Sequence, residues 1–284
     1  MSTKNNKENI NADYVQYKAE LGEGIYFDHC KNTLYWIDIN SSTLYRYDYI
    51  KCYRYVLKYK VSAVLEVEND QVYLSSEVGI VCYDFESREM NVISEMPENY
   101  AHDDYRSNDA IKLAKNLYMF GVMRNNPLKN DGVLVLSKNG HSKVIYRGIA
   151  IPNSFIKIPD ANSLLISDSF EKVTYRFDFN RMWDKVLGKT VWLDLSDTGM
   201  TPDGGCISQD GRIFLAIWDG HKIIELNLAG EVVGEFHLPF PRPTSCALDE
   251  TGSRLLVTSA YEGLSEDQLK AFPLSGTISE VNVE

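Results

Sequence analysis

The 284-residue sequence lacks any stretch of about 18 apolar residues, so it predicts no transmembrane helix. Residues 1–13 are polar and have no apolar segment of the kind found in secretory signal peptides. Basic side chains are a minority, with 29 Lys and Arg against 40 Asp and Glu, and the net charge is −11. This charge disfavours nucleic acids and membrane surfaces as partners, and leaves neutral small molecules and cations.

Cysteine is also scarce, and the five cysteines lie far apart in the sequence. They form no C-x-x-C pair, and no histidine stands beside them at metal-ligand spacing. Their odd number excludes a full disulfide framework and favours free thiols in a reducing compartment. We therefore expect a cytoplasmic protein. The five are Cys30, Cys52, Cys82, Cys206 and Cys246.

Common catalytic signatures are absent as well. The sequence contains no G-x-S-x-G, H-E-x-x-H or G-x-x-x-x-G-K-[ST] motif. Gly22-Glu23-Gly24 is no dinucleotide fingerprint, because the third glycine is missing. Nothing in the sequence supports a Ser-His-Asp triad.

Short β-rich runs recur along the chain where long helical periodicity is scarce. They are separated by Gly, Asn, Asp and Ser turns, at a period of roughly 40 to 50 residues. That spacing is typical of four-stranded propeller blades. The sequence therefore predicts an all-β, six-bladed β-propeller. The six runs are 34–39, 72–76, 117–122, 164–169, 213–218 and 255–260.

No linker rich in Pro or Gly interrupts the repeat, so we expect one domain over residues 14–284 after a flexible tail at 1–13. The last repeat lacks its outermost strand. We expect the strand-like segment 14–20 to supply it and close the ring, which would remove an exposed edge.

A polar residue lies about ten positions before each of these runs. In a propeller the first strand of each blade lines the channel, so equivalent positions form a ring at one end of it. All six ring residues carry oxygen and two are carboxylates, which are ligands that hard cations prefer. The alternative is that they form only turn and strand-entry hydrogen bonds. The six are Glu23, Ser62, Asn108, Asn153, Asp203 and Ser245.

Five segments resemble the regucalcin, gluconolactonase and luciferin-regenerating-enzyme family. The resemblance covers about residues 20–284, and the motifs are more specific as a set than singly. They are LGEGIYFDHCKNTLYWIDI (21–39), RSNDAIKLAKNLYMFGVM (106–123), IPNSFIKIPDANSLLISDS (151–169), TPDGGCISQDGRIFLAIW (201–218) and PTSCALDETGSRLLVTSA (243–260).

The resemblance implies a propeller that hydrolyses sugar lactones with one divalent cation: calcium, zinc, magnesium or manganese. By motif, Glu23, Asn153 and Asp203 match the metal ligands, and Asp203 also matches the general base. Arg106 and Asn108 match the substrate-binding pair. An exposed ion pair with an acidic neighbour is the alternative role for Arg106.

Two departures from the family pattern concern the substrate. Ser154 stands where family members usually carry Gly. After Gly121-Val122-Met123 the acidic substrate-binding residue of some members is missing, and Asn126 lies in that region. We expect Asn126 to contact substrate and the preference to differ from that of typical sugar-lactone enzymes.

Together these observations predict a metal-dependent hydrolase that opens a sugar lactone or related cyclic ester with metal-activated water. Two alternatives remain open at this stage. One keeps the site but cleaves an aryl ester or phosphotriester, and the other is a calcium-binding propeller without turnover.

Overall fold

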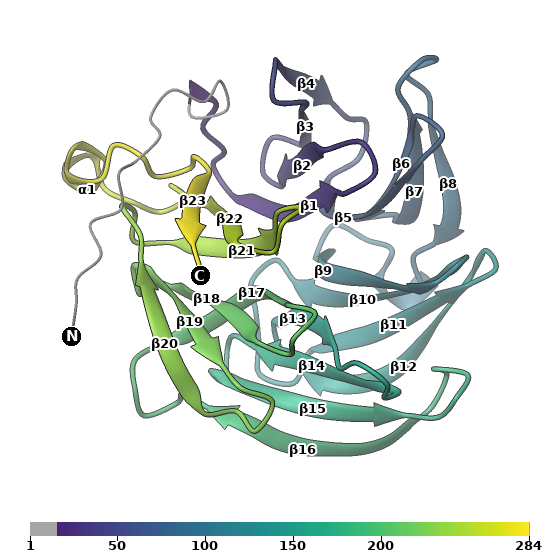
Figure 1. The fold of residues 1–284 in the computed structure, drawn as a ribbon. Helices are drawn as coiled ribbons and strands as arrows, with labels where there is room; N and C mark the ends of the chain where they lie inside the picture. The colour runs from purple at the N-terminus through teal and green to yellow at the C-terminus, as the bar shows by residue number, and fades with distance from the viewer. Residues whose placement is uncertain (1–15, 284) are drawn as a thin grey trace.

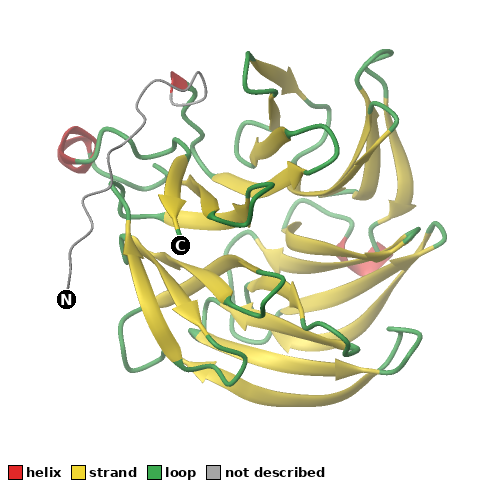
Figure 2. Cartoon of the chain, in the orientation of Figure 1, coloured by secondary structure: helices red, strands yellow, loops and turns green. Residues whose placement is uncertain are grey.

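The computed structural model describes residues 16–283, which form six β-sheets arranged as blades around a central axis (Figure 1). Strands and connecting turns account for nearly all of this part of the chain (Figure 2). The helical elements are short, with a 3-10 helix η2 (Glu98–Tyr100) and a helix α1 (Glu266–Ala271). No helix in residues 16–283 is long and apolar enough to cross a membrane.

Each blade is an antiparallel sheet whose strands pair in chain order from the axis outwards. The first blade has β1 (Gly22–Asp28), β2 (Thr33–Asp38), β3 (Thr43–Tyr47) and β4 (Cys52–Val56). The second has β5 (Val61–Glu68), β6 (Gln71–Ser76), β7 (Gly79–Asp84) and β8 (Met90–Glu95). The third has β9 (Tyr105–Ala114), β10 (Leu117–Arg124), β11 (Gly132–Lys138) and β12 (His141–Ile149).

The other three blades repeat this order, although the last has one strand fewer. The fourth has β13 (Pro152–Lys157), β14 (Ser163–Asp168), β15 (Val173–Phe179) and β16 (Val186–Asp194). The fifth has β17 (Thr201–Ile207), β18 (Ile213–Trp218), β19 (Lys222–Leu226) and β20 (Val232–His237). The sixth has β21 (Pro243–Leu248), β22 (Arg254–Ser259) and β23 (Ser279–Asn282).

The six predicted β-rich runs are the second strands of the six blades, which confirms the expected fold. Each predicted polar position lies on the innermost strand of its blade, near the start of that strand. Contacts between neighbouring inner strands run all the way round, from β1 through β5, β9, β13 and β17 to β21 and back to β1. The fold therefore gathers the six polar positions at one end of the channel.

The core is divided among the contacts between blades. Six clusters of buried apolar side chains occur in the described part of the chain, one at each interface between neighbouring blades. Trp36 of the first blade shares a cluster with Leu256 of the sixth, and Leu165 of the fourth shares one with Leu215 of the fifth. Because each blade buries both of its faces in this way, the second strands read as nearly continuous apolar runs.

Closure of the ring differs from the expected arrangement. The sixth blade shows three strands, and residues 16–20 form none, while residues 14 and 15 lie outside the described residues. Leu21 forms an isolated bridge to Ala260, and the Ala19 N–H donates to the Gly276 carbonyl at 2.8 Å. The segment before β1 thus contacts the last blade through single hydrogen bonds, and a fourth strand is not shown. The expected tail at 1–13 also lies outside the described residues.

Candidate functional site

Irregular strand pairing positions the predicted metal ligands. The register shifts between Glu23 and Tyr26 in β1, between Asn153 and Ile156 in β13, and between Pro202 and Gly205 in β17. Such a bulge inserts an extra residue and redirects the side chains beside it. The same irregularity in three blades turns equivalent side chains towards the channel.

Two residues that follow the ligands adopt the left-handed backbone conformation, Gly24 with φ +56° and Ser154 with φ +55°. A Cβ on Gly24 would lie 2.6 Å from the Ala63 Cα, so this position requires glycine. Ser154 has that conformation despite its side chain. Its hydroxyl donates to the Asp203 backbone carbonyl and accepts a hydrogen bond from Ser167 at 3.0 Å, which offsets the strain.

Asn153 and Asp203 are in direct contact, and both are buried. The Asn153 Nδ2 donates to Asp203 Oδ1 at 2.6 Å and to Ser169 Oγ at 3.1 Å. Ser169 Oγ in turn donates to the Pro202 carbonyl at 2.7 Å, so the orientation of the amide is fixed from two sides. The Asn153 Oδ1 is buried and has no hydrogen-bond partner. A buried oxygen without a donor is costly, which indicates a place for a positively charged group.

Glu23 completes the predicted triad, and its carboxyl interacts electrostatically with Asp203. Burial, then the Asp203 and Asp109 carboxylates, raise the pKa of Glu23 well above its usual value of 4.5. Burial and Asp109 likewise raise the pKa of Asp203 well above 3.8, although Arg106 and Asn153 act in the opposite direction. Neighbouring buried carboxylates resist ionisation unless a cation joins them.

Arg106 points into the protein, so the alternative of an exposed ion pair is not what the structure shows. Its Nη1 donates to the Ser107 carbonyl at 3.0 Å and to Asn108 Oδ1 at 2.7 Å. Asn108 Nδ2 donates to the Pro152 carbonyl at 3.1 Å, which links this pair to the fourth blade. Burial lowers the pKa of Arg106, while the Glu23, Glu262 and Asp203 carboxylates oppose that change.

The remaining predicted residues take no part in this contact network. Ser62 exchanges hydrogen bonds with Ser75 at 2.6 Å and with Ser107 at 2.5 Å, which is the structural role weighed against metal binding. The Ser245 N–H donates to the Thr258 hydroxyl. Asn126 is exposed in the turn after β10, and none of the observed hydrogen bonds joins it to the other site residues.

Two carboxylates of the site were not predicted as site residues. Asp109 Oδ1 accepts the Ala110 N–H at 2.7 Å and its Oδ2 accepts the Phe155 N–H at 3.3 Å. Burial raises the pKa of Asp109 to about 6, against the effect of these hydrogen bonds. Glu262, in the loop after β22, acts electrostatically on Arg106 and accepts a hydrogen bond from Asn40 at 2.9 Å.

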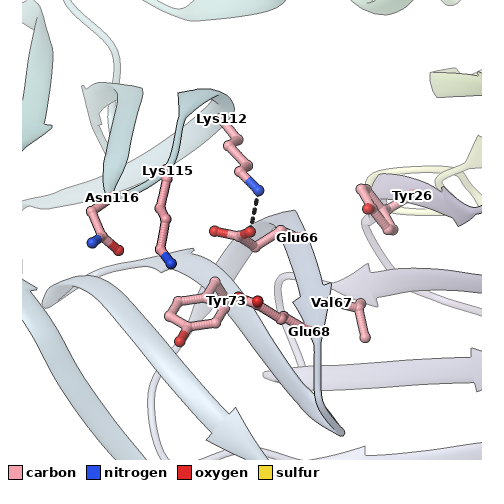
Figure 3. Close-up of a pocket in the computed structure, with 8 residues that line it drawn as sticks. All are labelled: Tyr26, Glu66, Val67, Glu68, Tyr73, Lys112, Lys115 and Asn116. Atoms are coloured by element: carbon pink, nitrogen blue, oxygen red, sulfur yellow. Dashed lines mark hydrogen bonds and ion pairs between the residues drawn. The ribbon is translucent and has the colours of Figure 1, made fainter.

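A cavity of about 240 Å³ lies elsewhere, where β5 and β9 approach their far ends (Figure 3). Lys112 pairs there with Glu66, which also accepts the Tyr118 hydroxyl at 2.5 Å. Glu66 and Lys112 stand four residues beyond Ser62 and Asn108 on the same strands, so this cavity is separate from the predicted site. Its buried carboxylate is already satisfied by two donors, and its lysines and glutamates balance in charge.

The predicted site offers oxygen donors only. A cation bound by Glu23, Asn153 and Asp203 would have two carboxylates and one amide oxygen as its protein ligands. In residues 16–283 no group of three His, Cys, Asp or Glu side chains offers an alternative metal site. Such oxygen donors suit Ca²⁺, Mg²⁺ or Mn²⁺, and carboxylate oxygens also bind Zn²⁺.

Comparison with known proteins places this arrangement in a family. The model of the SMP-30/Gluconolactonase/LRE-like region matches residues 21–261. The chain belongs to this family. The match spans the five motifs and all of the predicted metal-ligating and substrate-binding residues, and it confirms the resemblance noted from the sequence.

The family's relatives include proteins named as lactonases. A putative sugar lactone lactonase of Rhizobium meliloti is 25% identical over 272 residues, covering 94% of this chain and 91% of the relative. The L-arabinolactonase of Azospirillum brasilense is 26% identical over 269 residues, covering 91% and 87%. A calcium-binding regucalcin from Agrobacterium tumefaciens has the same fold, with a TM-score of 0.88, 22% identity and coverage of 95% and 92%.

Proposed function

We propose that this protein is a divalent-cation-dependent lactonase that opens a sugar lactone or a related cyclic ester. The observation that carries the proposal is the buried Asn153 Oδ1, which has no donor and belongs to an amide held against the Asp203 carboxylate. The similarity to lactonases over more than nine-tenths of the chain supports this class of substrate.

The charges of the site support a divalent cation. Glu23, Asp109, Asp203 and Glu262 carry four negative charges when ionised, and Arg106 carries one positive charge. The resulting excess of negative charge favours a divalent cation in the site. We assign its protein ligands as Glu23, Asn153 and Asp203. When bound, such an ion polarises an ester carbonyl and makes water more acidic.

The residues of the chain then have distinct tasks. Asp203 takes the proton of the water whose oxygen attacks the lactone carbonyl carbon. As the bond from that carbon to the ring oxygen breaks, the proton passes to the leaving oxygen, and the product is the open hydroxy acid. Arg106 donates hydrogen bonds to the substrate carbonyl or its hydroxyls, and Asn108 holds the guanidinium in place. Asn126, exposed in the turn after β10, contributes to substrate choice.

The experiment measures hydrolysis of gluconolactone and of simpler lactones by the cation-loaded protein, corrected for spontaneous ring opening. Asp203→Asn should lower kcat by about 100-fold or more, because it removes a proton acceptor and a ligand charge. Arg106→Ala should chiefly raise KM, because arginine is no cation ligand. Asp210→Asn, in the exposed turn of the same blade, is the control and should leave both constants unchanged. Absence of ring opening above background by the wild type would refute the proposal.

A further inference from the structure

A second, larger cavity lies on the outside of the molecule, away from the channel. It has a volume of about 730 Å³ and lies between the outermost strand of the first blade, β4, and the β7–β8 hairpin of the second. These two elements stand on neighbouring blades in Figure 1. Residues 53–58 form one wall, and Tyr83, Phe85, Arg88 and Met90 form the other. We call this cavity the outer groove.

An unpaired arginine stands against the aromatic rings of the outer groove. The Arg46 guanidinium carbon lies 5.7 Å from the ring centre of Tyr53 and 5.5 Å from that of Phe85. Arg46 forms no salt bridge with any residue in 16–283, and its Nε is buried without a hydrogen-bond partner there. A half-buried guanidinium retains strong demand for acceptors, because stacking on rings satisfies none of its N–H groups.

The charge of the outer groove is opposite to that of the molecule. Arg54, Lys58 and Arg88 line it. Within the described part of the chain none of the three forms a salt bridge, and no acidic side chain lines the groove. The segment 51–60 carries four basic residues and no acidic one, in a chain of net charge −11. Such a local positive patch attracts an anionic partner that the rest of the surface repels.

The groove follows an edge strand. β4 pairs with β3 on one side, and in the described residues no strand pairs with its other side. Six consecutive residues along β4 and just beyond it form the groove wall, a length of about 20 Å for extended chain. The Val56 side chain on this strand is 70% exposed. An extended segment laid along β4 would pair its backbone with the strand and place alternate side chains against the rings.

We propose that the outer groove binds an extended acidic peptide segment of a partner protein, with carboxylates alternating with aromatic or large apolar residues. The carboxylates meet Arg54, Lys58 and Arg88, and the apolar side chains pack on Tyr55 and Phe85. An edge strand selects for a peptide, because a nucleic acid has no backbone N–H groups to pair with it.

Isothermal titration calorimetry of the full chain with an acetylated hexapeptide of alternating glutamate and tyrosine tests this proposal. We expect saturable 1:1 binding that weakens with added salt. Matched peptides should fail, namely one with lysine for glutamate and one with alternate N-methylated backbone amides. The double variant Lys58→Glu/Arg88→Glu changes two exposed side chains and should bind at least about tenfold more weakly.

Arg181→Glu/Lys185→Glu is the matched control, because it reverses the same two charges on the exposed β15–β16 hairpin and should bind as the wild type does. Neither double variant should alter lactone hydrolysis, since the groove lies on outer strands. The proposal is overturned if the peptide does not bind at about 1 mM, or if Lys58→Glu/Arg88→Glu binds it unchanged. It is also overturned if a hexathymidylate oligonucleotide binds the groove more tightly than the peptide.

Discussion

At the scale of single residues, the proposed metal site depends on the Asn153 amide, whose nitrogen and oxygen have different surroundings. The nitrogen of Asn153 is used by Asp203 and Ser169, and its oxygen is left buried without a donor. An asparagine with only a structural role would have hydrogen-bond partners at both its nitrogen and its oxygen. The hydroxyl of Ser62, another residue of the predicted ring, has such partners in Ser75 and Ser107. This contrast separates the proposed ligand from a ring residue that only supports the fold.

Asn153→Leu keeps the side-chain volume and removes the oxygen, so the affinity for a divalent cation should fall at least about tenfold. Asn162→Leu is the control, because it makes the same substitution in the exposed β13–β14 turn of the same blade. Calorimetric titration with calcium and manganese, on variants whose circular dichroism matches the wild type, gives both affinities. Equal affinities for Asn153→Leu and wild type would show that the oxygen is no ligand.

The sequence predicts the three proposed ligands, but it does not predict the two neighbouring carboxylates, Asp109 and Glu262. Glu23, Asn153 and Asp203 recur at one register of the repeat, which is visible without a structure. Asp109 directly follows Asn108, and in a regular strand the two side chains would point to opposite faces. The pairing of β9 with β10 is irregular at this point, so both reach the site, and no sequence pattern announces that shift.

At the scale of elements, bulges in the inner strands β1, β13 and β17 turn side chains at equivalent positions of the repeat towards the same site. Each bulge needs a residue that accepts a positive φ or a close contact, and Gly24 meets both demands. The second strands, in contrast, are regular apolar runs, and for that reason they were found from the sequence. Residues 16–20 do not form the expected fourth strand of the sixth blade; Ala19 and the following Leu21 contact that blade through single hydrogen bonds.

Gly24→Ala should destabilise the protein by about 1–3 kcal/mol more than Gly252→Ala does. Both glycines have positive φ, +56° and +71°, but a Cβ on Gly252 meets nothing within 4 Å, whereas one on Gly24 meets the Ala63 backbone. Urea unfolding of both variants measures the difference. Equal losses of stability would mean that the close approach of β1 to β5 is not required.

The turn between β21 and β22 contains the buried carboxylate of Asp249, whose contribution to the stability of the fold depends on pH. Burial alone would raise the pKa of Asp249, but hydrogen bonds from Thr251 and Arg254 lower it below its usual value of 3.8. A lowered folded-state pKa stabilises the fold at pH values above 3.8, and this contribution is lost as the pH falls through the folded-state value.

Asp249→Asn should therefore lower the free energy of unfolding by about 1–3 kcal/mol at pH 6, and the deficit should shrink below about pH 3.8. Glu250→Gln changes the exposed neighbour and is the control, which should leave the free energy of unfolding at pH 6 unchanged. Urea unfolding at several pH values measures both. A deficit that is constant from pH 6 to pH 3 would contradict the assignment.

At the scale of the whole molecule, closure of the ring brings distant residues together. The Thr244 hydroxyl donates to the Gly22 carbonyl, and Glu262 comes close enough to act on Arg106 although the two are far apart in sequence. The number of blades followed from counting repeats, but such contacts depend on how the ends of the ring meet. The composition gives only one net charge for the whole chain. The fold is needed to show that the basic side chains of the outer groove lie together on an otherwise acidic molecule.

The central claim is that one divalent cation at Glu23, Asn153 and Asp203 supports lactone hydrolysis. The most direct test is the rate of gluconolactone opening after exhaustive chelation, followed by titration with calcium, zinc, magnesium or manganese. The account predicts that chelation abolishes the enzymatic rate and that at least one of these cations restores it, saturating at one ion per chain. A rate that survives complete removal of metal would contradict the account.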